Sequence, residues 1–343
     1  MHDINRIIVV DLLYLGDLIF AYPFFEELRK NYPEARIDLV ANSKFAEIVR
    51  ENDNIDHVYS FNKEWPAARS FSFVRKLKKN NYHLGLNIHG NWRTALLLKL
   101  IAPDYSAGYG GKGRGVFLDK ELKTADNKHM TEVYLDFLKD IGCNISGQEI
   151  VPVINFADKT DQIEKNLYSK LKEKNLSFGK DYIVLNTGGS WPTKQWPEEY
   201  FAQLADMIIS AGRDVLFVGG PGDVERVKKI IDLMKFKADN ICGQTSLLEL
   251  AFVLKKSQLL ISGDTGPVHV AAAAGTDTIT IFGPSDEVKY QPKGTGKHCI
   301  ITNNKLKCRP CGEHQCPLEH HKCMVDISPE IIFNELKNRG MIK

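Results

Sequence analysis

The residues best suited to binding a charged ligand follow short apolar runs in the second half of the chain. Each run is followed by a turn rich in glycine and hydroxyl groups: Thr187-Gly188-Gly189-Ser190 after 181–186, Gly219-Gly220 after 214–218, and Asp264-Thr265-Gly266 after 259–262. Glycine lets backbone N–H groups approach a phosphate closely, and hydroxyl groups add donors. Three such turns along one sheet edge predict a site for a phosphate-bearing ligand. An ordinary capped turn would show the same residue types without binding a ligand.

Two further side chains could serve that ligand. Lys194, within the stretch WPTKQWP, would supply positive charge to a pyrophosphate; the alternative is a solvated lysine between two core tryptophans. His269 lies in the helix predicted to begin at Gly266-Pro267, where proline suits the first turn because its missing N–H would have no intrahelical partner. None of the turns has the pattern GxxxxGK[ST] or GxGxxG, which argues against a P-loop NTPase and a standard NAD site.

These turns require parallel strands whose carboxyl ends share an edge, and the whole chain alternates strand and helix patterns. Strands are predicted at 6–10, 36–41, 57–61, 84–88, 105–109, 181–186, 214–218, 239–242, 259–262 and 278–282. Helices are predicted at 18–31, 45–50, 67–79, 91–100, 131–141, 159–174, 197–211, 223–234, 246–255 and from 266. Short connections between alternating elements predict α/β domains with doubly wound, mostly parallel sheets. The segment 145–158 lacks helical periodicity and contains Pro152, so we expect two domains, 1–157 and 158–343.

Composition narrows the class of protein. The 343 residues include 45 basic and 43 acidic side chains, a net charge of +2, which argues against nucleic-acid binding. No apolar run approaches the roughly 20 residues that span a bilayer. The first apolar stretch is interrupted by Arg6, Asp11 and Asp17 and is therefore not a signal peptide. We expect a cytoplasmic protein.

The motifs taken together resemble those of a known family. In order they are LGD at 15–17 followed by a helix with a proline, HGNWR at 89–93, TGGSWPTKQWP, FVGGPGD, SGDTGPVHVAAAAGT with FGP, and the tail CRPCGEHQCPLEHHKCM. This series is similar to glycosyltransferase family 9, the heptosyltransferases that build the inner core of lipopolysaccharide.

The resemblance implies a GT-B fold of two facing Rossmann-like domains. The N-terminal domain would lie on the acceptor side and carry the catalytic base, and the C-terminal domain would bind a nucleotide-sugar donor. The implied reaction is an inverting, metal-independent transfer of heptose from ADP-heptose to a lipid-linked core saccharide, with no cofactor, at the inner face of the cytoplasmic membrane. A nucleotide-sugar epimerase of the same architecture, or a family member that uses another donor sugar, stays an alternative.

The resemblance also implies roles for individual residues. Asp17 matches the catalytic base, although a simple helix cap is the alternative, and Lys194 matches the lysine that binds the donor phosphates. Positions matching the donor site are Thr187, Asp264, Thr265, Gly266 and His269. An anionic acceptor would meet the basic residues of the N-terminal domain, for which we expect Arg93, Lys112 and Arg114. One departure is that Asp11 and Tyr14 stand where members often carry a basic residue and a small one.

Four cysteines lie close together near the end of the chain. Cys308, Cys311, Cys316 and Cys323 have the spacing C-x2-C-x4-C-x6-C, with histidines between them. That density could hold a structural Zn²⁺ ion. Disulfides are a second alternative, although a cytosolic chain keeps its thiols reduced. A reduced loop without metal is the third, and no catalytic metal is expected.

Overall fold

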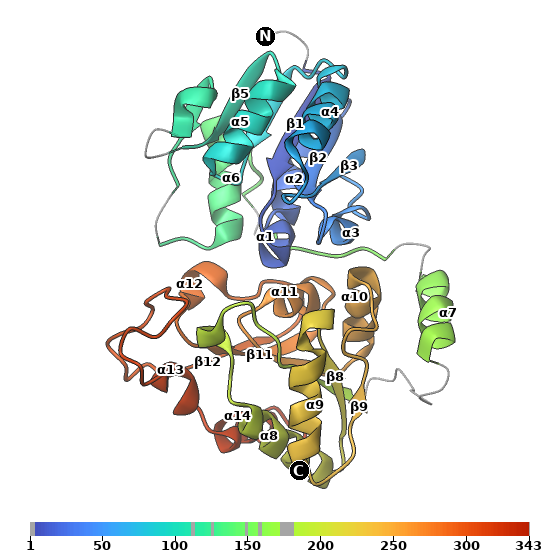
Figure 1. The fold of residues 1–343 in the computed structure, drawn as a ribbon, viewed down its shortest axis with the longest axis vertical. Coiled ribbons are helices and arrows are strands. Elements are labelled where there is room, and N and C mark those ends of the chain that lie inside the picture. The colour runs from blue at the N-terminus through green and yellow to red at the C-terminus, as the bar shows by residue number, and fades with distance from the viewer. Residues whose placement is uncertain are drawn as a thin grey trace. The chain divides into compact units, whose positions relative to one another are not determined.

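The computed structural model describes residues 4–110, 114–124, 127–147, 150–156, 160–171 and 182–342, without the side chain of Arg114 (Figure 1). The chain divides into two compact units, Met1–Pro152 and Val153–Lys343. Each unit contains a six-stranded parallel sheet, which confirms the predicted α/β class and the doubly wound sheets. The domain boundary expected after residue 157 falls among residues outside the described ranges.

The N-terminal unit is built around a sheet in the order β3-β2-β1-β4-β5-β6. Its strands are β1 (Arg6–Asp11), β2 (Arg36–Asn42), β3 (His57–Phe61), β4 (Leu84–Asn87), β5 (Tyr105–Tyr109) and β6 (Lys120–Leu122). Its helices are α1 (Leu15–Phe20), α2 (Tyr22–Asn31), α3 (Ala46–Val49), α4 (Ala67–Lys78), α5 (Trp92–Ile101), α6 (Met130–Asp140) and the 3-10 helix η1 (Arg114–Phe117). Helices α4 and α5 pack against each other, and α2 packs against α6, so helices cover both faces of the sheet.

The C-terminal unit has the sheet order β12-β11-β10-β7-β8-β9. Its strands are β7 (Tyr182–Asn186), β8 (Asp214–Val218), β9 (Asp239–Asn240), β10 (Leu259–Gly263), β11 (Asp277–Phe282) and β12 (His298–Thr302). Its helices are α7 (Thr160–Leu171), α8 (Glu198–Ser210), α9 (Val224–Leu233), α10 (Leu247–Lys256), α11 (Gly266–Ala273), α12 (Glu287–Tyr290), α13 (Lys322–Val325) and α14 (Pro329–Asn338), with 3-10 helices η4 (Pro192–Lys194) and η5 (Pro221–Asp223). Helix α8 packs against α9 and α14, and α10 packs against α7 and α11.

Three differences from the predicted elements have physical reasons. The helix predicted at 18–31 is two helices, because the chain turns at Ala21 before Pro23, so α1 begins earlier and includes Asp17. Strands β6 and β12 were not predicted because both are edge strands with weak patterns, and β6 has only three residues. Helix α14 was also missed; its apolar positions pack into the core around the buried Trp196, whose indole N–H donates to the Ile327 carbonyl at 2.8 Å.

Each sheet has a position where the strand order reverses. In the N-terminal unit it lies between β1 and β4, and in the C-terminal unit between β7 and β10. Connections leave two such adjacent strands in opposite directions, which opens a crevice at the carboxyl edge where ligands bind in α/β proteins. Asp17 lies in α1, the helix that follows β1, while Thr187 follows β7 and Asp264 follows β10, so predicted site residues lie at both reversal points.

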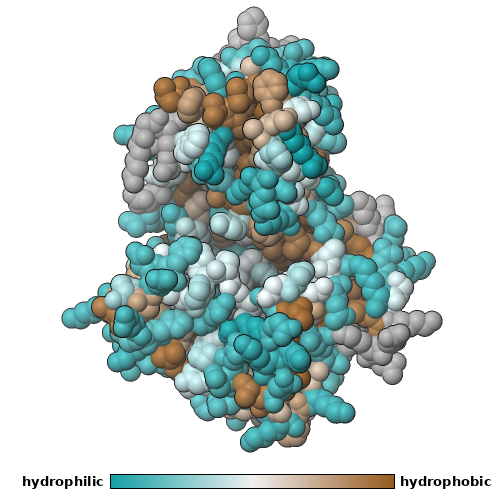
Figure 2. All heavy atoms as spheres, in the orientation of Figure 1, coloured by the Kyte–Doolittle hydropathy of each residue, from teal (hydrophilic) through white to brown (hydrophobic). Residues whose placement is uncertain are grey.

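The surface is largely hydrophilic on the face drawn in Figure 2, but hydrophobic side chains gather near α5 in the N-terminal unit. Trp92 and Leu100 on α5 are 49% and 46% exposed, and Val116 on the adjoining η1 is 77% exposed. Within the described residues, every helix is too short or too polar to cross a membrane.

Candidate functional site

The three glycine-containing turns of the C-terminal unit lie side by side. Strands β10, β7 and β8 are neighbours in the sheet, so the turns that follow them share its carboxyl edge. The side-chain amide of Asn186 donates to the hydroxyl oxygens of Ser262 at 2.9 Å and Thr265 at 3.0 Å, which ties the first turn to the third. The Thr187 hydroxyl beside them is buried and has no hydrogen-bond partner within the described structure.

An ion pair occupies the centre of this edge. The Lys194 ammonium lies 2.6 Å from Oδ2 of Asp264, and His269 Nε2 lies 3.5 Å from the other carboxylate oxygen. Burial by itself raises the pKa of Asp264, but the hydrogen bond from His269 and the charge of Lys194 outweigh it and lower the pKa to about 2. The Lys194 side chain is only 17% exposed. Lys194 is therefore an anchored cation at the turns and not a solvated surface lysine.

Helix α11 points its N-terminus at the same edge. Thr265 is its N-cap residue but does not cap the helix with its side chain, and Pro267 lies in the first turn. The first N–H groups of a helix have no intrahelical partner, and the helix dipole favours an anion there. The last residue of β10, Gly263, leaves room for the Lys194 loop, because a Cβ there would lie 2.9 Å from the Lys194 carbonyl oxygen. The Lys194 ammonium and the N-terminus of α11 thus lie at the same edge of the sheet.

The remaining predicted donor residues lie in the first two turns. Gly188 packs against Asp223, since a Cβ at Gly188 would lie 2.5 Å from a carboxylate oxygen of Asp223. The same Asp223 carboxylate accepts the Gly220 N–H at 2.9 Å, and Gly219 begins this second turn. Gly189 is half-buried and Ser190 is exposed. All the residues predicted for the donor site therefore lie in the three adjacent turns, in η4 or on α11.

A partly buried arginine that sequence reasoning missed holds the first turn in place. Arg226 on α9 donates through Nε to the Thr187 carbonyl at 3.0 Å and through Nη2 to the Trp196 carbonyl at 2.6 Å. Its Nη1 lies 3.0 Å from Glu198 and 3.2 Å from the Gln195 side-chain oxygen. A single arginine on an otherwise charged helix gives no sequence signal, because only the fold brings it under this loop.

The Cys-rich segment, residues 308–323, contacts the Lys194 loop directly. The Thr193 hydroxyl donates to the Glu313 carbonyl at 2.7 Å, and Nε2 of His321 lies 2.8 Å from the Thr193 carbonyl oxygen. The rings of Trp191 and His314 are stacked with centroids 3.8 Å apart. The tail of the chain therefore supports η4 and the residue before it.

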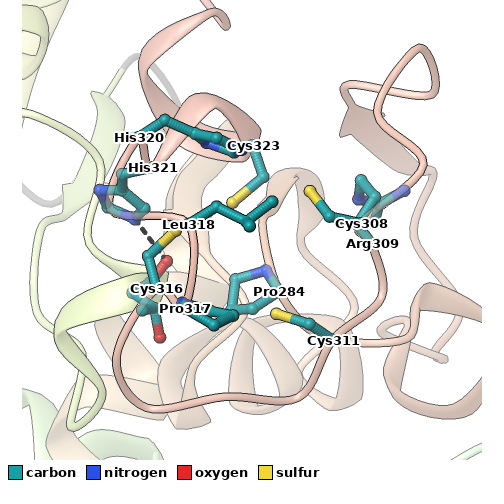
Figure 3. A pocket seen from close by; sticks show the side chains of 11 residues that line it. Pro284, Cys308, Arg309, Cys311, Cys316, Pro317, Leu318, His320, His321 and Cys323 are labelled. Atoms are coloured by element: carbon teal, nitrogen blue, oxygen red, sulfur yellow. Dashed lines mark hydrogen bonds between the residues drawn. The ribbon is translucent and has the colours of Figure 1, made fainter.

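The four clustered cysteines surround one pocket, which Thr193 also lines (Figure 3). Burial first, and then the charges of Cys311, Cys316 and Cys308, raise the pKa of the Cys323 thiol to about 11. All seven cysteines of the chain are free thiols. Within the described residues, no three His, Cys, Asp or Glu side chains have the arrangement of a metal site. The zinc ion stays a prediction from the spacing.

Asp17 lies in the first turn of α1 in the N-terminal unit. Its carboxylate accepts the backbone N–H of Tyr14, the N-cap residue, at 3.2 Å. Asp17 is half-buried, whereas Tyr14 is 61% exposed. The carboxylate thus helps to close its own turn and keeps contact with solvent.

Three ionisable groups adjoin Asp17. Asp11 is fully buried at the end of β1, and His89, two residues after β4, accepts the Leu12 N–H at Nδ1 over 3.2 Å. Burial lowers the pKa of His89 to about 4, helped by the charge of Lys63. Burial also lowers the pKa of Lys63, which the charges of Asp11 and Asp17 oppose. Asp17 therefore belongs to a cluster of acidic and basic groups at the strand-order reversal.

The predicted acceptor residues are only partly described. Arg93 is exposed in the first turn of α5, with its guanidinium 5.5 Å from the centre of the Trp92 ring. Lys112 lies outside the described residues, and so does the side chain of Arg114. The first turn of α5 is fixed by Asn91, whose side chain accepts the Arg93 N–H at 2.9 Å.

Comparison with known proteins decides the class of protein. The family model for glycosyltransferase family 9 (heptosyltransferase) matches residues 70–322, well over half of the chain. The chain belongs to glycosyltransferase family 9. As a member, it is a glycosyltransferase, and the sequence-based resemblance is confirmed.

Individual relatives cover nearly the whole chain. Lipooligosaccharide heptosyltransferase 2 of Campylobacter jejuni is 26% identical over 333 residues, 95% of each protein. A family 9 glycosyltransferase of Veillonella parvula has the same fold, with a TM-score of 0.86, 25% identity and 98% coverage of each chain. The Escherichia coli ADP-heptose lipopolysaccharide heptosyltransferase II has a TM-score of 0.81 at 20% identity, covering 97% of this chain and 98% of that one. The GT-B fold expected from the sequence is confirmed.

Proposed function

We propose that this glycosyltransferase moves a heptose from ADP-heptose to the inner core of a lipopolysaccharide. The main support for a nucleotide-sugar donor is the Lys194–Asp264 ion pair. It lies at the N-terminus of α11, at the strand-order reversal of the C-terminal sheet. The similarity to proteins named as heptosyltransferases of lipooligosaccharide and lipopolysaccharide supports the sugar and the acceptor.

The donor turns have the chemistry needed to hold and release a diphosphate. Breaking the bond between the anomeric carbon and the phosphate oxygen leaves its electron pair, and a growing negative charge, on ADP. Lys194 and the positive end of the α11 dipole would stabilise that charge. The buried Thr187 hydroxyl would donate to the same group, and Asp264 would keep Lys194 in position. A reaction supported in this way needs neither a catalytic metal nor a cofactor.

Asp17 is the residue we assign as the general base. As the acceptor oxygen forms its bond to the anomeric carbon, its hydroxyl proton passes to the Asp17 carboxylate. Attack from the side opposite the leaving diphosphate inverts the configuration of that carbon. The half-buried position of Asp17 suits this role, because the carboxylate is held by its turn and remains accessible.

We place the acceptor on the N-terminal unit and the enzyme at a membrane surface. Arg93 is exposed and would bind a phosphate or carboxylate of the core saccharide, and Lys112 and Arg114 are proposed for the same task from the sequence. Exposed Leu100 and Val116 would rest on the lipid face that carries the acceptor. We propose that the protein meets this acceptor at the inner face of the cytoplasmic membrane.

A transfer assay tests this proposal. Purified protein is mixed with ADP-heptose and with lipopolysaccharide core precursors that differ by one heptose, and released ADP and product mass are measured. We expect ADP release that depends on one precursor and adds one heptose to it. Conversion of the donor sugar without acceptor would instead identify an epimerase, and no turnover with any precursor would contradict the proposed substrates.

A further inference from the structure

Asp11 is a buried carboxyl group that the proposed reaction does not use. It is the last residue of β1 and has no exposed surface. Its Oδ1 accepts the Leu13 N–H at 2.9 Å, and its Oδ2 has no hydrogen-bond partner within the described structure. A buried polar atom without a partner is costly, so such an atom in a native structure calls for an explanation.

The turn from Asp11 to Asp17 is held by the groups of this cluster. Asp11 fixes the Leu13 N–H, His89 fixes the Leu12 N–H, and Asp17 fixes the Tyr14 N–H. These three bonds order the three successive residues that join β1 to α1. Asp11 therefore helps to fix the backbone of the turn that precedes the proposed base, Asp17.

The two carboxyl groups also interact through their charges. The pKa of Asp11 is raised to about 7, first by burial and then by the negative charge of Asp17, while Lys63 acts in the opposite direction. The Lys63 ammonium lies 5.8 Å from the centre of the Tyr14 ring, beside this turn. His89 is neutral near pH 7 because its own pKa is about 4. The charges that act on Asp11 are thus those of Asp17 from α1 and Lys63 from the loop after β3, while the neutral His89 from the loop after β4 bonds to the neighbouring Leu12 N–H.

We propose that Asp11 is a positioning residue for Asp17, which holds the turn carrying the base and sets, through its own charge, how strongly Asp17 binds a proton. The inference rests on the proposed role of Asp17. When Asp11 is protonated, Asp17 is the weaker base; when Asp11 is ionised, its negative charge strengthens Asp17. Asp11 itself contacts no substrate.

Carboxyl ¹³C NMR of aspartate-labelled protein tests the interaction without any activity. We expect one resonance that titrates near pH 7 in the native protein and is absent from Asp11→Asn. Asp17→Asn should move this titration to lower pH by removing a like charge, and Lys63→Gln should move it to higher pH. Lys76→Gln, which removes an exposed lysine of α4, should leave it in place. A titration near the ordinary aspartate range of about 4, or one that Asp17→Asn does not move, would overturn the proposal.

The transfer assay then tests the effect on Asp17. In the native enzyme kcat should rise about threefold to tenfold as pH rises through about 7, because ionised Asp11 strengthens the base. Asp11→Asn should lose that rise, whereas Lys63→Gln should shift it to higher pH. If the NMR titration is present but kcat of Asp11→Asn keeps the native pH profile, Asp11 does not act on Asp17.

The two arms separate this inference from the proposed function. An NMR titration that Asp17→Asn moves, combined with no heptose transfer by the native protein, contradicts the proposed reaction but not the carboxyl pair. Should Asp11→Asn fail to fold, Asp17→Asn and Lys63→Gln still decide the result, because both of these side chains are partly or largely exposed.

Discussion

Single side chains make the sharpest tests of the reaction, beginning with Asp17. Asp17→Asn keeps an oxygen that can accept the Tyr14 N–H but cannot take a proton from the acceptor. We expect kcat to fall by roughly two to four orders of magnitude, the range for general bases, while ADP binding is unchanged. Asp53→Asn, an exposed carboxylate of the same unit, is the matched control. Near-native turnover in Asp17→Asn would remove Asp17 from the mechanism.

Lys194 tests the leaving-group site. Lys194→Gln keeps a donor toward Asp264 and loses the charge, so we expect ADP to bind about 10- to 100-fold more weakly, the usual effect of a hydrogen bond to a charged group. Lys170→Gln, at an ion pair with Glu249 elsewhere in the unit, should bind ADP normally. Calorimetric titration with ADP measures both. Adding EDTA to the native enzyme should leave transfer intact, and a strict Mg²⁺ requirement would contradict a site built on Lys194 and α11.

Asp11 gives the folded protein a pH dependence of its own. Its pKa rises from 3.8 to about 7 on folding, by burial first and Asp17 second. Between those values the folded chain holds a proton that the unfolded chain has lost, so the free energy of unfolding decreases as pH rises through this interval. Hydrogen exchange of β1 should therefore quicken between about pH 4 and pH 7 beyond its intrinsic increase. If the exchange rate of β1 in Asp11→Asn showed the same extra increase, the pH dependence would not come from Asp11.

Among the elements, the Cys-rich segment and η4 act together. Thr193 links them through its hydroxyl and its carbonyl, one residue before Lys194. Thr193→Val keeps the shape of the side chain and removes the bond to Glu313. Loss of this hydrogen bond should weaken donor binding by about 0.5–1.5 kcal/mol. We therefore expect a donor KM roughly two- to tenfold higher, with kcat little changed.

A second buried threonine supplies the control for this brace. Thr280 on β11 is also fully buried, but its hydroxyl has no partner within the described residues, so Thr280→Val should leave the donor KM unchanged. His321→Ala removes the other bond of the brace and should raise the donor KM as Thr193→Val does. Equal KM values in all three variants and the native enzyme would show that the segment does not support the donor loop.

For the protein as a whole, the open question is how it meets a lipid-linked acceptor. Leu100 and Val116 expose hydrophobic side chains near α5, on the unit that carries Asp17 and Arg93. Replacing both with serine should lower binding to vesicles containing anionic lipid about tenfold, because the lost apolar contact is worth more than 1 kcal/mol. Leu233→Ser, at an equally exposed leucine of the C-terminal unit, is the control in a vesicle sedimentation assay. Unchanged binding of the double variant would place the membrane contact elsewhere.

The sequence by itself determined the fold class, the parallel sheets and the residues of the three glycine-containing turns. Buried parallel strands read as continuous apolar runs, and turns at their ends need glycine, so both leave local patterns. Because these patterns are local, the predicted bounds of β1, β5 and β8 agree with the structure almost to the residue. Edge strand β12 and helix α14 carry weaker patterns because other elements of the unit supply much of their packing.

Only the tertiary structure decided which side chains meet. Lys194 and Asp264 are 70 residues apart, and Arg226 reaches Thr187 across 39 residues, so no spacing rule could pair them. The burial of Asp11 is likewise invisible in the sequence, where an aspartate after a strand looks like an exposed turn residue. Contacts of this kind depend on strand order, because the reversal between β7 and β10 puts distant turns at one edge. Local sequence preferences determine which helices and strands form, and the packing of the sheets determines which side chains become neighbours.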